Sequence, residues 1–186
     1  MDRRALCVAL AAAPLVACTT TTATKTDPAA RKREIDAAVV RAQDDLYRQV
    51  NGSREMVARS SGILVFPNLV SAGFGLGGTY GEGALRKRGA TAAYYRMAGG
   101  SIGLIIGAQS RAVFLMFMTP DALRKFEASS GWTAGVDASV AVLDVGADAQ
   151  ITTQNIQQPV VAYVLTNKGL MANLSFEGTK ITRLDI

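Results

Sequence analysis

Nearly every second residue between positions 73 and 83 is glycine, in the run Gly-Phe-Gly-Leu-Gly-Gly-Thr-Tyr-Gly-Glu-Gly. Glycine inside a strand costs about 0.5–1 kcal/mol relative to alanine, so its repetition needs a compensating reason. The usual reasons are a sharp bend, a bulge, or a second backbone that passes too close for a side chain. The segment therefore predicts a strongly curved, barrel-like or sandwich-like sheet, whose glycine-lined side lies under a helix or around a pocket.

Short segments of β character lie on both sides of the glycine run. They cover residues 63–66 (closed by Pro67), 92–97, 102–108, 112–118, 132–145, 160–166, 170–176 and 180–184. Sequences typical of turns separate several of them, at residues 86–89, 98–100, 167–169 and 177–178. Many short strands at this spacing, with only a few helices, predict an α+β domain with a mainly antiparallel sheet.

Helices are expected in two places outside the β region. The first begins at Asp27-Pro28, where Asp is the cap and Pro the first helical residue. Apolar residues at helical spacing give it one buried face: Ile35, Val39, Ala42, Leu46 and Val50. A shorter helical piece with Met56 and Val57 follows the turn at Asn51-Gly52. The second helix begins at Thr119-Pro120-Asp121 and extends to about residue 129.

The first 18 residues resemble the lipobox signal of bacterial lipoproteins. Arg3 and Arg4 precede an apolar run over residues 5–17, which ends in Leu-Val-Ala before Cys18. These features are typical of a secretory signal peptide, and the run is too short to span a bilayer comfortably. We expect cleavage before Cys18 and acylation of its thiol. The alternative is a plain signal peptide in which this cysteine is incidental.

This interpretation divides the chain into three parts. Residues 1–17 form the signal peptide, the threonine-rich residues 18–26 form a flexible tether, and residues 27–186 form a single domain. Thr19 follows the cysteine, where an aspartate would signal retention in the inner membrane of a Gram-negative bacterium. We therefore expect a protein anchored by lipid in the outer membrane, on its periplasmic face.

The composition weighs against an enzyme. The chain has no histidine, and its only cysteines are Cys7, in the signal, and Cys18. A histidine-dependent triad, a thiol nucleophile and a thiolate metal site are therefore not expected, and neither is a cofactor. The net charge of +5 is too mild to indicate a nucleic-acid binder.

Two catalytic-looking motifs lack the context they need. Residues 73–78 match G-x-G-x-x-G, but no helix pattern follows and position 98 is alanine rather than an acidic residue. Residues 99–103 match G-x-S-x-G around Ser101, yet no histidine exists to activate that serine. Paired carboxylates could make another kind of hydrolase, but the spacing of the candidates fixes no two of them as a pair on one element: Glu82, Asp137, Asp144 and Asp148. A hydrolase stays the weakest alternative.

Two basic clusters are candidates for contact with lipid phosphates. One opens the first helix and comprises Arg31, Lys32 and Arg33, and the other is the turn that comprises Arg86, Lys87 and Arg88. Basic residues near an anionic membrane surface contribute about 1 kcal/mol each. The alternative is that both clusters are merely solvated, and that the first helix packs only on its own domain.

The glycine-rich region also carries a family resemblance. The chain is similar to the SYLF domain over roughly residues 32–186. The similarity is carried by residues 62–67 (Gly-Ile-Leu-Val-Phe-Pro), 72–83, 130–137 (Ser-Gly-Trp-Thr-Ala-Gly-Val-Asp) and 167–181. The resemblance implies binding of lipid head groups, since eukaryotic members bind phosphoinositides, and it brings no catalytic residue. The family also includes a yeast actin-binding protein.

From the resemblance we expect a non-enzymatic envelope lipoprotein that binds anionic phospholipid. The second hypothesis is a structural or scaffolding lipoprotein that binds another envelope protein.

Overall fold

The computed structural model describes residues 27–133, 136–142, 158–166, 169–170 and 179–186. The predicted signal peptide, Cys18 and the tether lie outside these residues. So do residues 167–168 of one predicted turn, the predicted turn at 177–178, and most of the predicted strand at 170–176.

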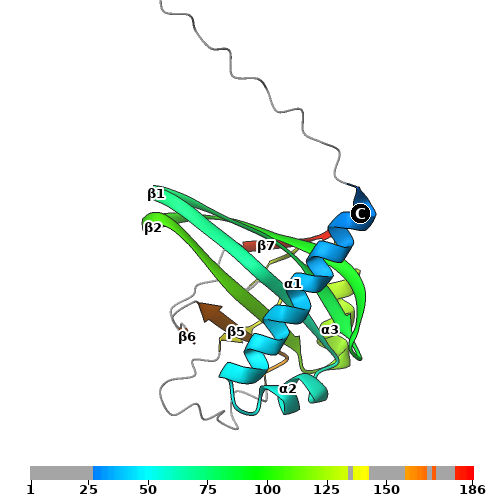
Figure 1. Ribbon diagram of the computed structural model, residues 1–186. Helices are drawn as coiled ribbons and strands as arrows, with labels where there is room; N and C mark the ends of the chain where they lie inside the picture. The colour runs from blue at the N-terminus through cyan, green and yellow to red at the C-terminus, as the bar shows by residue number, and fades with distance from the viewer. Residues whose placement is uncertain (1–26, 134–135, 143–157, 167–168, 171–178) are drawn as a thin grey trace, which may run out of the picture.

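The described elements form an α+β fold, as predicted. The helices are α1 (Pro28–Gln49), α2 (Ser53–Arg59) and α3 (Pro120–Ala128). The strands are β1 (Gly62–Lys87), β2 (Ala90–Phe117), β3 (Trp132–Thr133), β4 (Val140–Val142), β5 (Val160–Thr166), β6 (Gly169–Leu170) and β7 (Thr179–Leu184). Figure 1 shows α1 lying across the outside of the strongly curled sheet. None of the described helices combines the length and apolar character that crossing a bilayer requires.

The helices begin where the sequence predicts. The Asp27 side chain accepts a hydrogen bond from the backbone N–H of Ala29 at 3.1 Å, which caps α1. The Thr119 hydroxyl accepts from the backbone N–H of Ala122 at 3.2 Å and caps α3 in the same way. Between α1 and α2, Gly52 has φ 78°, a left-handed conformation that glycine adopts without strain.

Strands β1 and β2 form one long hairpin, so the separate strands expected at 63–66, 92–97, 102–108 and 112–118 are joined. The two strands are antiparallel from Gly62↔Phe117 to Lys87↔Ala90. Its turn is the predicted one, and Arg88 (φ 50°) and Gly89 (φ 82°) both have positive φ, as a tight hairpin of right-handed twist requires.

Two of the predicted strand boundaries are wrong. Residues 98–100 do not form a turn, because Gly99 pairs with Thr79 inside the ladder. Pro67 does not end the first strand. It lies in a register shift between Phe66 and Leu69, where the ladder tolerates a residue without an N–H.

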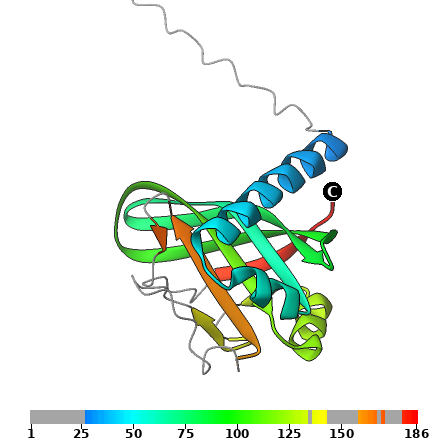
Figure 2. The same cartoon turned by 60° about the horizontal axis from the view of Figure 1, so that its bottom comes forward.

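The remaining strands pair with the two halves of β2. The order is β3-β7-β2-β5-β4, with β1 added to β2 and β6 to β5. All pairings are antiparallel except the one between β4 and β5. The single strand expected at 132–145 is instead represented by β3 and β4 in the part of the chain that is described. Because β5 and β7 pair with different halves of a bent strand, the sheet curls into a half-barrel (Figure 2).

Glycines allow the halves of β1 to pass close to each other, as the spacing predicts. A Cβ added to Gly83 would overlap the carbonyl oxygen of Val65, and one on Gly81 would lie 2.9 Å from the carbonyl oxygen of Asn68. A side chain at either position would push the two halves apart. Gly81 and Gly83, at the end of the glycine run, are therefore required by the bend.

The two faces of the curled sheet carry separate apolar cores. The α1 face buries the predicted residues of α1 against alternate strand residues, among them Ile63, Val65, Phe114 and Tyr163. The opposite face packs on α3, where Phe126 lies 4.8 Å from Phe117, 4.9 Å from Tyr95 and 5.7 Å from Trp132 between ring centroids. Successive strand residues thus face different cores, a rule that locates the polar side chains discussed below.

Candidate functional site

A pocket of about 360 Å³ lies where the C-terminal half of α1, helix α2 and the turn between β1 and β2 meet. Three of the described residues that line it are arginines, Arg54, Arg86 and Arg88, and none is an aspartate or a glutamate. Gln43 and Tyr47 add polar groups from α1. We call this the arginine pocket. A hollow with charges of one sign concentrates ions of the other sign.

Arg86 is held in place by neighbours that leave its charge uncompensated. Its Nη1 donates to Oε1 of Gln43 at 2.8 Å, and its Nη2 donates to the carbonyl oxygen of Gly89. Its Nε is buried and has no hydrogen-bond partner. Both acceptors are neutral, so the guanidinium is fixed in position while its positive charge stays available.

The other two arginines complete the basic wall. The Arg54 guanidinium lies 4.4 Å from the centroid of the Tyr47 ring, a cation–π arrangement. Tyr47 in turn accepts a hydrogen bond from the side chain of Gln43. Arg88 is exposed at the turn. None of the ion pairs found among the described residues involves Arg54, Arg86 or Arg88.

The structure divides the predicted cluster at 86–88. Arg86 and Arg88 line the arginine pocket, but Lys87 lies on the other face of the strand. There its Nζ is 2.7 Å from Oε1 of Glu127 in α3, so its charge is already paired. The alternation of side chains along β1 explains the division.

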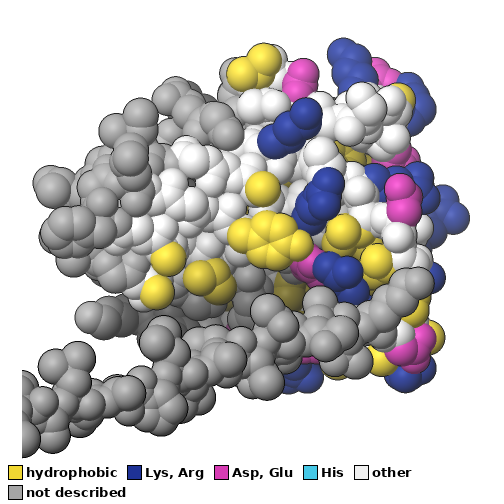
Figure 3. Space-filling view, turned by 90° about the horizontal axis from the view of Figure 1, so that it is seen from above, with side chains coloured by type: hydrophobic (Ala, Val, Ile, Leu, Met, Phe, Trp, Pro, Cys, Tyr) yellow, Lys and Arg dark blue, Asp and Glu magenta, His cyan; other side chains and the backbone are white. Residues whose placement is uncertain are grey.

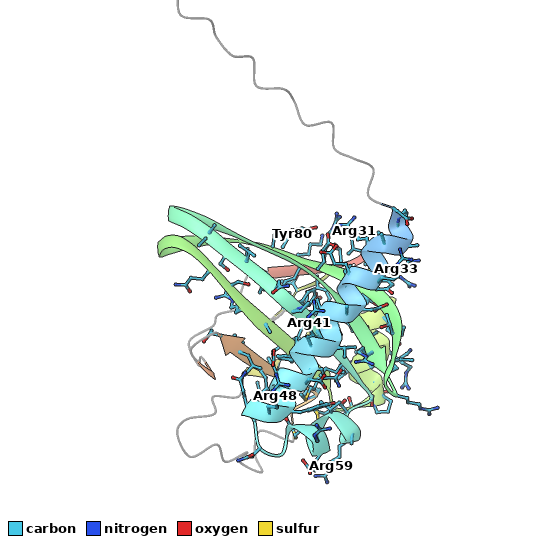
Figure 4. The ribbon with its side chains drawn as sticks, viewed as in Figure 1. Arg31, Arg33, Arg41, Arg48, Arg59 and Tyr80 are labelled. Carbon is cyan, nitrogen blue, oxygen red and sulfur yellow. The ribbon has the colours of Figure 1, made fainter. Side chains whose placement is uncertain are left out.

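The predicted cluster at the start of α1 lies elsewhere. Gln43, which marks the pocket on α1, is about 18 Å further along the helix axis than Arg31. Seen from above, Lys and Arg side chains gather on one side of the molecule, next to exposed hydrophobic side chains (Figure 3). Figure 4 shows Arg31, Arg33, Arg41 and Arg48 following α1 from its start towards its end.

Two of the three residues in that cluster have partners. Arg31 forms an ion pair with Glu82, and Lys32 lies 5.9 Å from the centroid of the Tyr94 ring. Burial opposes ionisation of Glu82, but the hydrogen bonds from Arg31 and Tyr80 outweigh it and lower the pKa of this carboxyl. Arg33 is exposed.

The residues considered for catalysis are not brought together by the described part of the fold. Glu82 is occupied by its ion pair, and the side chain of Ser101 lies outside the described residues. Within the described ranges, no three Asp, Glu or Cys side chains are grouped so that they would hold a metal ion.

Comparison with known proteins finds a family match in the second half of the chain. A model of the Ysc84 family, described as Las17-binding protein actin regulator, matches residues 98–185. This match confirms the predicted resemblance to the SYLF family over residues 98–185. A search of curated proteins finds no match. The matched residues run from the middle of β2 to β7, so the elements that build the arginine pocket precede them in the chain.

Three of the pocket residues were not predicted from the sequence. Gln43 follows Ala42 on the buried side of α1 and is only 8 % exposed, so a polar residue on an apolar helix face was the available signal. Tyr47 lies one turn further along the same helix. Arg54 gave no signal, because only the packing of α2 beside the hairpin turn brings it to the pocket.

Proposed function

We propose that this SYLF-domain protein is a non-enzymatic, lipid-anchored protein of the outer membrane that binds anionic phospholipid, and that the arginine pocket takes the head-group phosphate. The observation that carries the proposal is the set of three arginines around one hollow whose described lining has no carboxylate. A guanidinium offers paired N–H donors that match two oxygens of a phosphate.

The energy available is adequate for head-group recognition. Hydrogen bonds to charged groups contribute about 1.5–3 kcal/mol each. Gln43 and the carbonyl of Gly89 already orient Arg86, so less side-chain freedom is lost when a phosphate binds. A weak site is sufficient if Cys18 carries the expected lipid, because the anchor raises the effective concentration of lipid around the domain.

The chain provides a matched control for this proposal. Arg86→Gln, Arg88→Gln and Lys87→Gln each remove one positive charge from the same turn, but only the first two change the pocket. Flotation of the Cys18→Ser protein with phosphatidylglycerol vesicles and with phosphatidylcholine vesicles measures binding. We expect binding only to the anionic vesicles, with a loss of about tenfold or more for the two arginine variants.

Two outcomes would contradict the proposal. Equal losses for Lys87→Gln and Arg86→Gln would show that general surface charge is responsible rather than the pocket. Equal binding to both kinds of vesicle would show that the phosphate charge is not recognised.

A protein partner is the second candidate function. The family description names a regulator that binds another protein. On this chain, Val70 and Tyr80 are 44 % and 49 % exposed and line a shallow groove of about 480 Å³ on the outer side of β1. Capture of an envelope protein that is lost in Val70→Ser and Tyr80→Ser, without vesicle binding by the wild type, would favour this function.

A further inference from the structure

Arg111 lies in β2 on the face of the sheet opposite α1. It pairs with Leu69 of β1 and with Thr166 of β5. Its neighbour Ala112 packs against the core under α1, whereas Val113 belongs to the core on the α3 side. Because strand side chains alternate, Arg111 shares the face of Val113, inside the curve of the half-barrel.

On that face Arg111 contacts one hydroxyl group directly, and a second hydroxyl lies next to the first. Its Nη2 donates to Oγ of Ser71 at 2.7 Å, and Oγ of Ser71 lies 2.7 Å from Oγ1 of Thr79. Ser71 is only 2 % exposed. Ser71 and Thr79 come from the two halves of β1, so the bend in this strand assembles a small polar cluster beside the guanidinium.

The positive charge of Arg111 has no counterion in the part of the chain that is described. None of the ion pairs there includes Arg111, and its Nε is buried without a hydrogen-bond partner. Burial lowers the pKa of this guanidinium. Removing a charge from water without pairing it is strongly unfavourable, and folded proteins normally supply a partner. By contrast, Arg31, which is also partly buried, is paired with Glu82.

We propose that Arg111, Ser71 and Thr79 form a second anion-binding position, which takes the carboxylate or phosphate group of a ligand at the inner face of the half-barrel. The unpartnered Nε–H and an Nη–H lie on one edge of the guanidinium, which matches two oxygens of such a group. One hydroxyl proton of the Ser71–Thr79 pair is free to donate to the same anion, because the other is used in the hydrogen bond between them. This position is independent of the arginine pocket, which lies on the α1 face of the sheet.

Thermal unfolding of the Cys18→Ser protein and its Arg111→Met variant tests the proposal. Sodium phosphate, sodium acetate and sodium chloride are compared at equal ionic strength. Without phosphate or acetate, Arg111→Met is expected to unfold at a higher temperature than the parent, because an unpaired charge is removed. Phosphate is expected to raise the Tm of Arg86→Gln, in which the arginine pocket is impaired, by about 3–6 °C at ten times its Kd, and to leave the double variant Arg86→Gln/Arg111→Met unchanged.

The source of the anion is distinguished by a further arm with short-chain phosphatidic acid. Stabilisation by phosphate or acetate alone shows that a small free anion suffices, whereas stabilisation only by phosphatidic acid shows that a lipid head group is needed. Equal stabilisation of Arg86→Gln and of Arg86→Gln/Arg111→Met would overturn the proposal, and Arg111 would then serve only to bond Ser71.

A second measurement covers the case in which Arg111→Met does not fold. The Nε–Hε NMR signal of Arg111 in the parent protein is followed during titration with phosphate and with short-chain phosphatidic acid. A saturable shift supports the second anion-binding position, and a signal unmoved by either ligand refutes it. Neither result depends on the vesicle experiment with Arg86→Gln, so failure of one proposal does not imply failure of the other.

Discussion

Binding of a phosphate monoester to the arginine pocket should weaken as the pH falls from 7.5 to 5, although the pocket itself keeps its charge. The chain has no histidine, the side chain whose ordinary pKa lies in this range. The described lining has no aspartate or glutamate, and guanidinium groups stay protonated. A phosphate monoester, however, gains its second negative charge with a pKa of about 6. The pH dependence of binding therefore reports the ionisation of the ligand.

The magnitude follows from the three arginines that surround the ligand. A unit charge 4 Å from another is worth about 1 kcal/mol in water and about 4 kcal/mol near a protein surface. The interaction energy of the second phosphate charge, summed over the three guanidinium groups, therefore exceeds the ~1.4 kcal/mol that corresponds to a factor of ten in affinity. The doubly charged fraction falls from about 97 % at pH 7.5 to about 9 % at pH 5 for a pKa of about 6. Affinity should fall about five- to tenfold.

Flotation of the Cys18→Ser protein with vesicles that contain phosphatidic acid, a monoester, measures the effect at constant ionic strength. Phosphatidylglycerol is the control lipid, because its diester carries one charge throughout this range. Arg86→Gln should flatten the pH dependence. Equal falls on both lipids, or no fall on phosphatidic acid, would refute the reasoning that the pocket responds to the second charge.

Two further predictions concern the fold. Gly83→Ala places a Cβ against the Val65 carbonyl and should lower the free energy of unfolding by about 3 kcal/mol or more, and the Tm by roughly 10 °C. Gly100→Ala is the control, because the space around its Cβ is open and its Tm should not change. Equal Tm values for the two variants would contradict the close approach of the two halves of β1. Burial raises the pKa of Tyr94 and Tyr163 from 10.0 to about 12, and Tyr94 also donates a hydrogen bond to the carboxylate of Asp36. The stability that the two protonated phenols contribute is therefore fully present below pH 10 and is lost as the pH rises to about 12, so the urea midpoint of unfolding should fall over that range. An ultraviolet titration in which all tyrosines ionise near pH 10 would exclude this prediction.

The parts of the fold that depend on neighbouring residues could be predicted from the sequence. The caps at Asp27 and Thr119 and the apolar face of α1 are local patterns, and the structure has them as expected. The turn at 86–89 is also local, since its geometry needs only residues that accept positive φ. The glycine run predicted the curvature because few other arrangements tolerate so many missing side chains.

The extent of the strands could not be predicted, because glycine is common both in turns and in crowded strands. Because of that ambiguity the sequence predicts a turn at residues 98–100, where the structure has a continuous strand. The deciding contact is distant in sequence, since a Cβ on Gly99 would lie 3.1 Å from Oγ1 of Thr179. Only the pairing of β2 with β7 shows that Gly99 is required inside a sheet.

The candidate site was half predictable for the same reason. Arg86 and Arg88 stood out as a dense basic turn, but the pattern did not separate them from Lys87. Their separation depends on the face of β1 that α1 covers, and the contribution of Arg54 depends on where α2 packs. A linear sequence shows where charges are concentrated, and the fold decides which of them remain unpaired.

Polar contacts between α1 and the β1–β2 hairpin connect the arginine pocket to the docking of the whole helix. Arg31 pairs with Glu82 near the start of α1, and Gln43 accepts from Arg86 near its end. A helix displaced by one turn, about 5.4 Å, would break both contacts at once and withdraw Gln43 from the guanidinium that it orients. The position of α1 is thus part of the geometry of the pocket. A phosphate bound by Arg86 must then stabilise α1 on the sheet by the same free energy with which docked α1 strengthens the binding of the phosphate.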